Sequence, residues 1–193
     1  MELRYQKLRI RNALKEDCKQ LAAWWNDGSV MAHAGFPLGL GISPLEVYEK
    51  ISMDDEARRH LILEHDGLPI GELYYYQQNE KAVEIGIKIC QADYQEKGLG
   101  RMALSMLIEE LFSMGAKVIL LDTNLTNARA QHVYELLGFI KVAVHNDSFS
   151  DQLGKLQSSV DYELRKADFV SAIMDKEESV LSDMKNYGIS PCI

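Results

Sequence analysis

The segment from Val83 to Arg101 constrains the fold of this chain more than any other stretch. Apolar residues occupy every second position of Val83–Ile89, which is the period of a strand with one buried face. A polar loop follows, and Gly98 and Gly100 then precede an apolar stripe with helical spacing. This order places unpaired backbone N–H groups and the positive end of a helix dipole where a phosphate can bind. The segment by itself predicts a strand, a loop and a helix; the glycines either admit a phosphate or only ease the start of the helix.

The flanking segments predict a mixed sheet with helices around it. The strands expected from apolar patterns are Leu8–Arg11, His60–His65, Pro69–Gln77, Val83–Ile89, Val118–Leu121, Ile140–His145 and Val160–Leu164. Turn signals at Asp66-Gly67 and Asn79-Glu80-Lys81 join the second, third and fourth strands into an antiparallel meander. The helix after Gly98 is followed by the apolar run Val118–Leu121, which predicts a parallel crossover. The expected fold class is therefore α/β (α+β), with a mixed, mostly antiparallel sheet of about seven strands.

Two details of the remaining chain complete this expectation. Ser43-Pro44-Leu45-Glu46 has the pattern of a helix N-cap followed by a proline and a capping glutamate. Between the last two strands, Asn146–Ser159 reads as a polar loop. We expect residues 1–166 to form one domain and residues 167–193 a C-terminal helical extension, which either packs on the domain or makes a homodimer contact.

Composition excludes several classes of function. The net charge of -8 disfavours non-specific nucleic-acid binding, because that requires a basic surface. No apolar stretch approaches the length that spans a membrane, and the N-terminus has no uninterrupted signal core. The three cysteines lack CxxC spacing and the five histidines lack HxH or HExxH spacing, so neither a disulfide framework nor a metal site is expected. These features favour a cytoplasmic protein.

Two motifs give the opening segment a more specific meaning. Gln95-Glu96-Lys97-Gly98-Leu99-Gly100 matches the Q/R-x-x-G-x-G/A signature of the GNAT acyltransferase superfamily. One strand downstream, Asn127 followed by Tyr134 and Leu137-Gly138-Phe139 resembles its second signature. The opening Leu8-Arg9-Ile10-Arg11 and the sequence Trp25-Asn26-Asp27 are similar to the subgroup of ribosomal-protein N-terminal acetyltransferases.

The resemblance implies a sheet that splays between Val83–Ile89 and Val118–Leu121, with acetyl-CoA as co-substrate in the split. By this likeness, backbone groups of the first of these strands pair with the pantetheine arm, and the following loop holds the pyrophosphate. The implied cofactor-binding residues are Ile87, Lys88, Ile89, Gln95, Glu96, Lys97, Gly98, Leu99, Gly100, Arg101 and Asn127. Without the resemblance, Asn127 is equally explained as a helix N-cap.

The implied chemistry is direct attack of an amine on the thioester, which needs a proton donor and a proton acceptor. Tyr134 would face the sulfur as general acid, although it also fits as a core tyrosine. Glu84 is the expected base and Glu72 the alternative, and each could instead be a solvated or substrate-binding carboxylate. Cys90 lies on the same strand face as Glu84, but no partner histidine is near it in sequence, so a nucleophilic role is not expected.

The acceptor side is the least determined part. Trp24, His33, Phe36 and the cluster Tyr74–Tyr76 could line its pocket, and packing explains the tyrosines equally well. The expected function is an acetyl-CoA-dependent N-acetyltransferase acting on a primary amine of a small molecule or peptide. The alternatives are a non-catalytic acyl-CoA sensor or interaction module, and a nucleotide-binding module.

Overall fold

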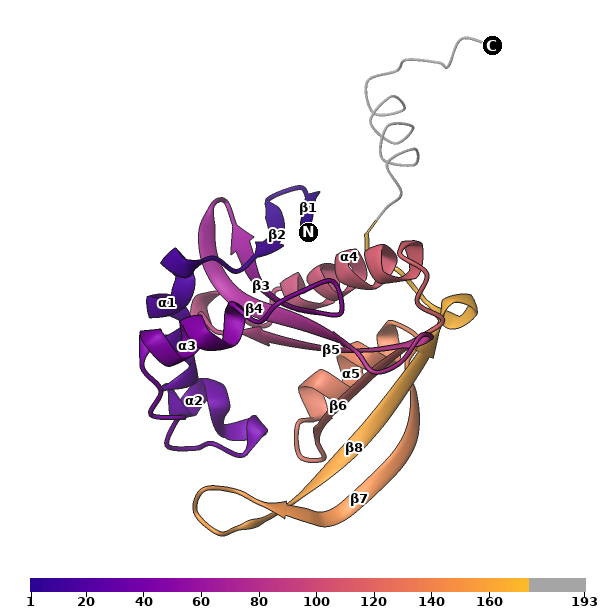
Figure 1. Ribbon diagram of the computed structural model, residues 1–193. Coiled ribbons are helices and arrows are strands. Elements are labelled where there is room, and N and C mark those ends of the chain that lie inside the picture. The colour runs from indigo at the N-terminus through magenta and orange to yellow at the C-terminus, as the bar shows by residue number, and fades with distance from the viewer. Residues whose placement is uncertain (174–193) are drawn as a thin grey trace, which may run out of the picture.

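A single eight-stranded sheet organises residues 1–173, the part of the chain that the computed structural model describes (Figure 1). Its strands are β1 (Glu2–Tyr5), β2 (Leu8–Asn12), β3 (Arg58–His65), β4 (Leu68–Gln77), β5 (Ala82–Ile89), β6 (Val118–Asn124), β7 (Ile140–Ser150) and β8 (Leu156–Arg165). The α-helices are α1 (Cys18–Trp25), α2 (Gly28–Met31), α3 (Pro44–Ile51), α4 (Leu99–Ser113) and α5 (Ala128–Leu136). Four 3-10 turns are η1 (Lys15–Asp17), η2 (Ala32–Ala34), η3 (Ala92–Tyr94) and η4 (Lys166–Asp168).

The strands follow the order β1-β2-β3-β4-β5-β6-β8-β7. All neighbours pair antiparallel except β5 and β6, which are parallel because α4 crosses over between them. This confirms the mixed, mostly antiparallel fold that the sequence predicts. The strand count is eight rather than about seven, because Glu2–Tyr5 folds back on β2 as a short edge strand.

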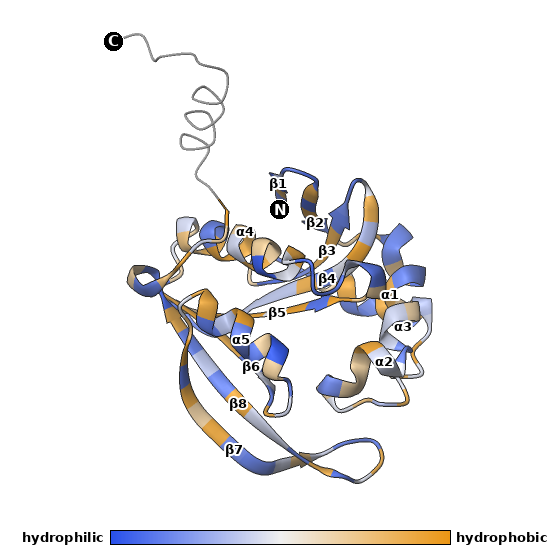
Figure 2. Ribbon diagram, turned by 180° about the vertical axis from the view of Figure 1, so that it is seen from behind, coloured by the Kyte–Doolittle hydropathy of each residue, from blue (hydrophilic) through white to orange (hydrophobic). Residues whose placement is uncertain are grey.

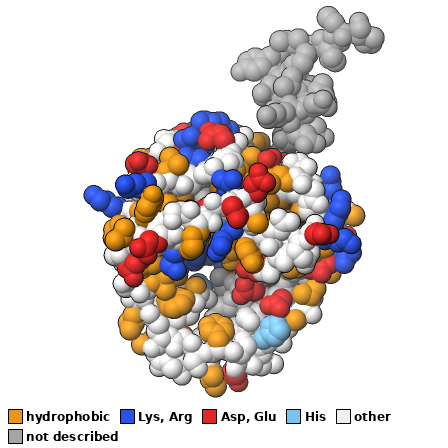
Figure 3. All heavy atoms as spheres, in the orientation of Figure 1, with side chains coloured by type: hydrophobic (Ala, Val, Ile, Leu, Met, Phe, Trp, Pro, Cys, Tyr) orange, Lys and Arg blue, Asp and Glu red, His pale blue; other side chains and the backbone are white. Residues whose placement is uncertain are grey.

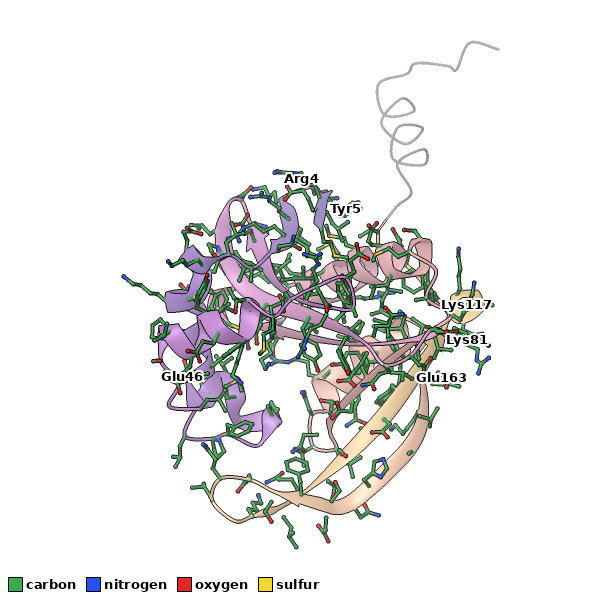
Figure 4. All side chains as sticks on the ribbon, viewed as in Figure 1. Arg4, Tyr5, Glu46, Lys81, Lys117 and Glu163 are labelled. Carbon is green, nitrogen blue, oxygen red and sulfur yellow. The ribbon has the colours of Figure 1, made fainter. Side chains whose placement is uncertain are left out.

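Helices cover both faces of the sheet. Figure 2 shows α4 lying along one face of the sheet. Its residues Ala103, Leu107 and Ile108 are fully buried in the core cluster that includes the strands. The opposite face carries α1 and α3, whose buried side chains form a second cluster with Ile62 of β3. The predicted start of α3 is confirmed: the Ser43 hydroxyl accepts from the Glu46 N–H, and Figure 4 labels Glu46 in the first turn of this helix.

The last two strands are longer than the sequence predicts. The polar loop expected over Asn146–Ser159 is wrong: β7 and β8 extend through most of it, and the turn between them covers only residues 151–155. Most of β7 is exposed at the edge of the sheet, so polar residues are tolerated on both of its faces. The alternation that marks a strand is therefore missing from this part of the sequence.

The sheet divides between β5 and β6. The two strands pair only where Ala82–Glu84 meets Val118–Leu120, and no further register joins them. At the paired end the Lys117 N–H donates to the Lys81 carbonyl oxygen over 2.8 Å, and Figure 4 shows both lysines there. Beyond Glu84 the strands diverge, which confirms the predicted splay.

The described chain ends on the helical layer. Phe169 contacts Phe112 of α4 with ring centroids 6.0 Å apart, and the Val170 N–H donates to the Leu137 carbonyl oxygen over 3.0 Å. After η4, residues 169–173 are irregular, and the remainder of the helix expected from Ala167 lies outside the described residues. The division into residues 1–166 and 167–193 stays a prediction. No helix in residues 1–173 is long and apolar enough to cross a membrane.

Candidate active site

A cleft of about 460 Å³ occupies the split between β5 and β6. Figure 3 shows a hollow in this face of the molecule, with acidic side chains along part of its rim. The residues of the cleft that the motifs predicted are Ile87, Lys88, Ile89, Gln95, Glu96, Gly98, Asn127 and Tyr134. The structure therefore brings the two sequence motifs together at one opening, although a strand and a helix separate them along the chain.

The edge of β5 that faces the split is available for hydrogen bonding. The Cys90 N–H donates to the Ile70 carbonyl oxygen on the β4 side. Backbone groups alternate in direction along a strand, so those of Ile87 and Ile89 point into the split. The Ile89 carbonyl oxygen accepts from the Gln95 side-chain amide over 2.9 Å, which ties the following loop back to this strand.

The loop ends in a backbone conformation that suits anion binding. Gly98 is the N-cap of α4 and has a φ of 76°, in the left-handed region that favours glycine. The first N–H groups of the helix, which include Leu99, Gly100 and Arg101, have no partner within a helix by geometry. The end of α4 thus offers donors and a positive dipole at the mouth of the cleft.

Basic side chains surround this helix end but differ in their contacts. Arg129 pairs with Glu96 over 3.0 Å, and the Lys97 ammonium lies 5.8 Å from the Tyr94 ring centroid. The Arg101 guanidinium instead donates to the Leu136 carbonyl oxygen over 3.2 Å, toward the end of α5. Its Nε is buried without a partner among the residues that the structure describes.

Asn127 begins α5 beside the cleft. Its side-chain oxygen accepts from the Ala130 N–H over 3.3 Å, and its amide donates to the Thr123 hydroxyl over 3.3 Å. The residue is therefore an N-cap, as the simpler sequence interpretation holds, and it lines the cleft at the same time.

The Tyr134 side chain projects from α5 and lines the cleft. Its ring is held between Phe139, 5.9 Å away, and Tyr162, 5.6 Å away, so only 7% of the residue is exposed. Burial first, and then the nearby charge of Asp122, raises the pKa of Tyr134 above its usual value. The phenol therefore keeps its proton at neutral pH, and within residues 1–173 its hydroxyl has no hydrogen-bond partner.

Asp122 is the cleft-lining carboxylate that the sequence interpretation missed. It follows the buried part of β6 and faces the split. Partial burial is the largest cause that raises the pKa of Asp122 above its usual value, and the charges of Glu84 and Asp161 raise it further. A charged residue directly after the apolar run Val118–Leu121, five positions before Asn127, was the signal that could have found it.

Glu84 and Glu72, the two residues predicted as the catalytic base, do not line the cleft. Glu84 lies at the paired end of β5, where it accepts from the Gln78 amide and from the Tyr74 hydroxyl, and it does not line the cleft. Glu72 is 6% exposed, and its two oxygens accept from Trp25 Nε1 over 2.7 Å and Lys88 Nζ over 2.9 Å. Glu72 thus ties α1 to the sheet.

Only some of the residues predicted on the acceptor side line the cleft. His33 and Tyr74 line the cleft, and the Tyr74 ring lies against Gly86 of β5. Trp24 and Tyr75 are buried in the two cores, whereas Phe36 and Tyr76 are exposed away from the cleft. Residues not anticipated there are Ser29, Phe149 and Ser159.

Cys90 does not have the surroundings of a nucleophile. Burial first, and then the charge of Glu72, raises the pKa of the Cys90 thiol, so the protonated form dominates at neutral pH. No group of three histidine, cysteine, aspartate or glutamate side chains in residues 1–173 is arranged to hold a metal ion.

Comparison with known sequences assigns the family. The sequence model described as the acetyltransferase (GNAT) family matches residues 2–139. The chain belongs to the GNAT acetyltransferase family. The matched part contains β5, the Gln95–Arg101 loop, Asn127 and Tyr134, so the resemblance seen in the motifs is confirmed.

Curated relatives of this GNAT chain match over a shorter region. It is 37% identical over 62 residues to a ribosomal protein bS18-alanine N-acetyltransferase of Salmonella typhimurium, a match covering 32% of this chain and 42% of that protein. The corresponding Escherichia coli K12 protein is 36% identical over 63 residues, which is 33% of this chain and 43% of that protein. The chain thus spans less than half the length of the curated relatives it matches.

Solved structures share the fold over most of the chain. A spermidine N-acetyltransferase from Vibrio cholerae in complex with CoA and spermine has a TM-score of 0.74 at 21% identity, covering 84% of this chain and 97% of its own. A ribosomal L7/L12 α-N-protein acetyltransferase in complex with CoA has a TM-score of 0.74 at 13% identity, covering 86% and 98%. A Salmonella typhimurium acetyltransferase with acetyl-CoA has a TM-score of 0.67 at 23% identity, covering 89% and 99%.

Proposed function

We propose that this protein is an acetyl-CoA-dependent N-acetyltransferase that transfers the acetyl group directly to a primary amine. The observation that carries this proposal is the convergence of three groups on one cleft: the backbone edge of β5 that β6 leaves unpaired beyond Glu84, the N-terminus of α4 and the side chain of Tyr134. Family membership supports acetyl-CoA as the donor. The names of its relatives support an amine acceptor, either on a protein or on a polyamine.

The chain has residues that fit acetyl-CoA. Ile87 and Ile89 would pair with the pantetheine arm, because their backbone groups face the split. The amides from Gln95 to Arg101 would hold the pyrophosphate, with Arg129 adding positive charge beside them. Asn127 would contact the cofactor from the opposite wall. Bound acetyl-CoA supplies the activated thioester.

The side chains that would move protons both line the cleft, Asp122 from β6 and Tyr134 from α5. The incoming amine loses a proton to Asp122, which we propose as the base in place of Glu84 because Asp122 opens on the cleft. Tyr134 donates its proton to the leaving sulfur. The new N–C bond forms as the C–S bond breaks, so the products are an amide and a free thiol.

A test of the phosphate-binding loop uses two glycines with nearly the same backbone conformation. Gly98 has a φ of 76° beside the cleft, and Gly67 has a φ of 79° in the β3–β4 turn. A Cβ would meet no atom within 4 Å at either position, so alanine introduces only backbone strain. We expect Gly98→Ala to weaken CoA binding about tenfold by calorimetry, because the free loop relieves the left-handed strain of about 1–2 kcal/mol by leaving this conformation, and CoA binding must restore it.

Gly67→Ala is the matched control. It should lower thermal stability in the same way but leave CoA affinity as in the wild type. Equal CoA affinity in both variants would show that the loop does not hold the cofactor. Tight binding of ATP or NAD without preference for CoA would favour the nucleotide-binding alternative.

The whole proposal is tested with an acceptor panel that reads out free CoA thiol. The panel contains polyamines, aminoglycosides, amino acids and peptides with free N-termini. Transfer to one of these classes supports the enzyme. Tight CoA binding without transfer to any amine would favour the acyl-CoA sensor instead.

A further inference from the structure

Two segments that are far apart in the sequence enclose one end of the cleft. His33 and Ala34 of η2 line it on one side, and Phe149 of β7 lines it on the other. In Figure 1 the β7–β8 hairpin extends from the body of the sheet toward the region of α2. Bound CoA would occupy the part of the cleft at the α4 N-terminus, which leaves this enclosed end for the acceptor.

Gln152, in the turn of the hairpin, joins the two segments with three hydrogen bonds. Its backbone N–H donates to the Gly35 carbonyl oxygen over 3.0 Å. Its side-chain oxygen accepts from the Leu38 N–H over 2.9 Å, and its side-chain amide donates to the Gly39 carbonyl oxygen over 2.7 Å. We call this set of contacts the Gln152 strap.

The loop that receives the strap is itself fixed. The Asn26 amide donates to the Ile42 carbonyl oxygen, and its oxygen accepts from the Ile42 N–H, both over 2.8 Å. The Phe149 ring also lies 3.1 Å from where a Cβ of Gly35 would stand, so the hairpin packs directly on the loop. The two segments that border this end of the cleft are therefore held at a fixed separation.

The hairpin side is tied to the wall of the cleft. The Asp151 carboxylate accepts from the Gln157 amide over 2.8 Å, and the Gln157 oxygen accepts from the Asn124 amide over 2.9 Å. Asn124 is 5% exposed and lines the cleft on β6. A chain of hydrogen bonds thus runs from the cleft wall to the residue next to Gln152.

The charges in the cleft favour a cation without a carboxylate. The lysine and the arginine that line the cleft both form ion pairs: Lys88 pairs with Glu72, and Arg129 pairs with Glu96. Asp122 faces the cleft, and no lysine, arginine or histidine within residues 1–173 forms an ion pair with its carboxylate. Apolar Val30, Ala34 and Phe149 complete the enclosed end, which suits an alkyl chain.

We infer that the Gln152 strap determines acceptor specificity: it admits an unbranched cationic alkylamine and disfavours amines on a branched carbon. This inference rests on the proposed acetyltransferase function. Gln152 acts as a positioning residue, because it holds the two walls and does not reach the reacting atoms.

The test compares wild type, Gln152→Ala and the control Leu153→Ala with two acceptors, putrescine and an alanine-initiated peptide. Gln152→Ala removes both side-chain hydrogen bonds of the strap, whereas Leu153 is 66% exposed in the same turn. We expect the wild type and Leu153→Ala to prefer putrescine in kcat/KM. Gln152→Ala should shift that ratio about tenfold toward the peptide, with the KM for acetyl-CoA unchanged.

The remaining outcomes distinguish failure of this inference from failure of the proposed acetyltransferase function. A wild-type preference for the peptide, or a ratio that Gln152→Ala leaves unchanged, overturns the role of the strap but not the acetyltransferase function. Absence of transfer by the wild type to these two acceptors and to the whole amine panel overturns the proposed function, and the inference with it.

Discussion

Replacing Tyr134 with phenylalanine should reduce turnover by about 10²–10⁴-fold and leave CoA affinity nearly unchanged, because only the donated proton is lost. The ring should stay in place, since it packs between Phe139 and Tyr162. The measurement is kcat from the free-thiol assay, together with the CoA Kd from calorimetry. A loss of kcat at constant Kd is what removal of the general acid predicts.

Tyr162 provides a matched control for this substitution. Its ring contacts that of Tyr134, but its hydroxyl donates to Gln131 and Glu135, and it does not line the cleft. Tyr162→Phe removes the hydroxyl group from the neighbouring ring and should keep turnover near that of the wild type. If Tyr134→Phe also retained wild-type turnover, the proposed proton donor would be rejected.

Asp122→Asn should cause the second large loss, also about 10²–10⁴-fold in kcat/KM at neutral pH, because the neutral amide cannot accept the proton of the amine. The pH profile adds a separate test. A base works only above its pKa, and the pKa of Asp122 is raised. Activity of the wild type should therefore fall, on acidification, at a higher pH than an ordinary aspartate would give.

Glu84→Gln separates the base expected from the sequence from the one proposed from the structure. The charge of Glu84 raises the pKa of Asp122, so its removal should lower that pKa and move the acid limb to lower pH. If Asp122 is the base, Glu84→Gln should retain most turnover at neutral pH. A large loss in Glu84→Gln with little loss in Asp122→Asn would return the role to Glu84.

The position of the cleft was largely predictable from local patterns. The alternation in Val83–Ile89, the glycines after it and the apolar run at Val118–Leu121 each report on a few consecutive residues. Together they indicated a parallel crossover, and the structure places the sheet's split at that crossover. The length of β7 was not predictable in this way, because an exposed edge strand has no buried face to impose alternation.

The identity of the acidic residue that lines the cleft required the tertiary structure. Glu84 and Asp122 are both acidic residues on strands, and sequence spacing does not show which of them opens on the split. The divergence of β5 and β6 decides it: Glu84 lies where the strands still pair, and Asp122 lies beyond.

The sequence by itself determined the family, the strand–loop–helix unit and the residues around Gly98 and Tyr134, because these depend on short-range periodicity and on motifs. Only the tertiary structure decided the surroundings of Asp122, the structural use of Glu72 and the link from Gln152 to the loop at Gly35. Those features depend on contacts between segments that are distant along the chain. Such contacts are fixed by how the sheet and its helices pack, which no local pattern encodes.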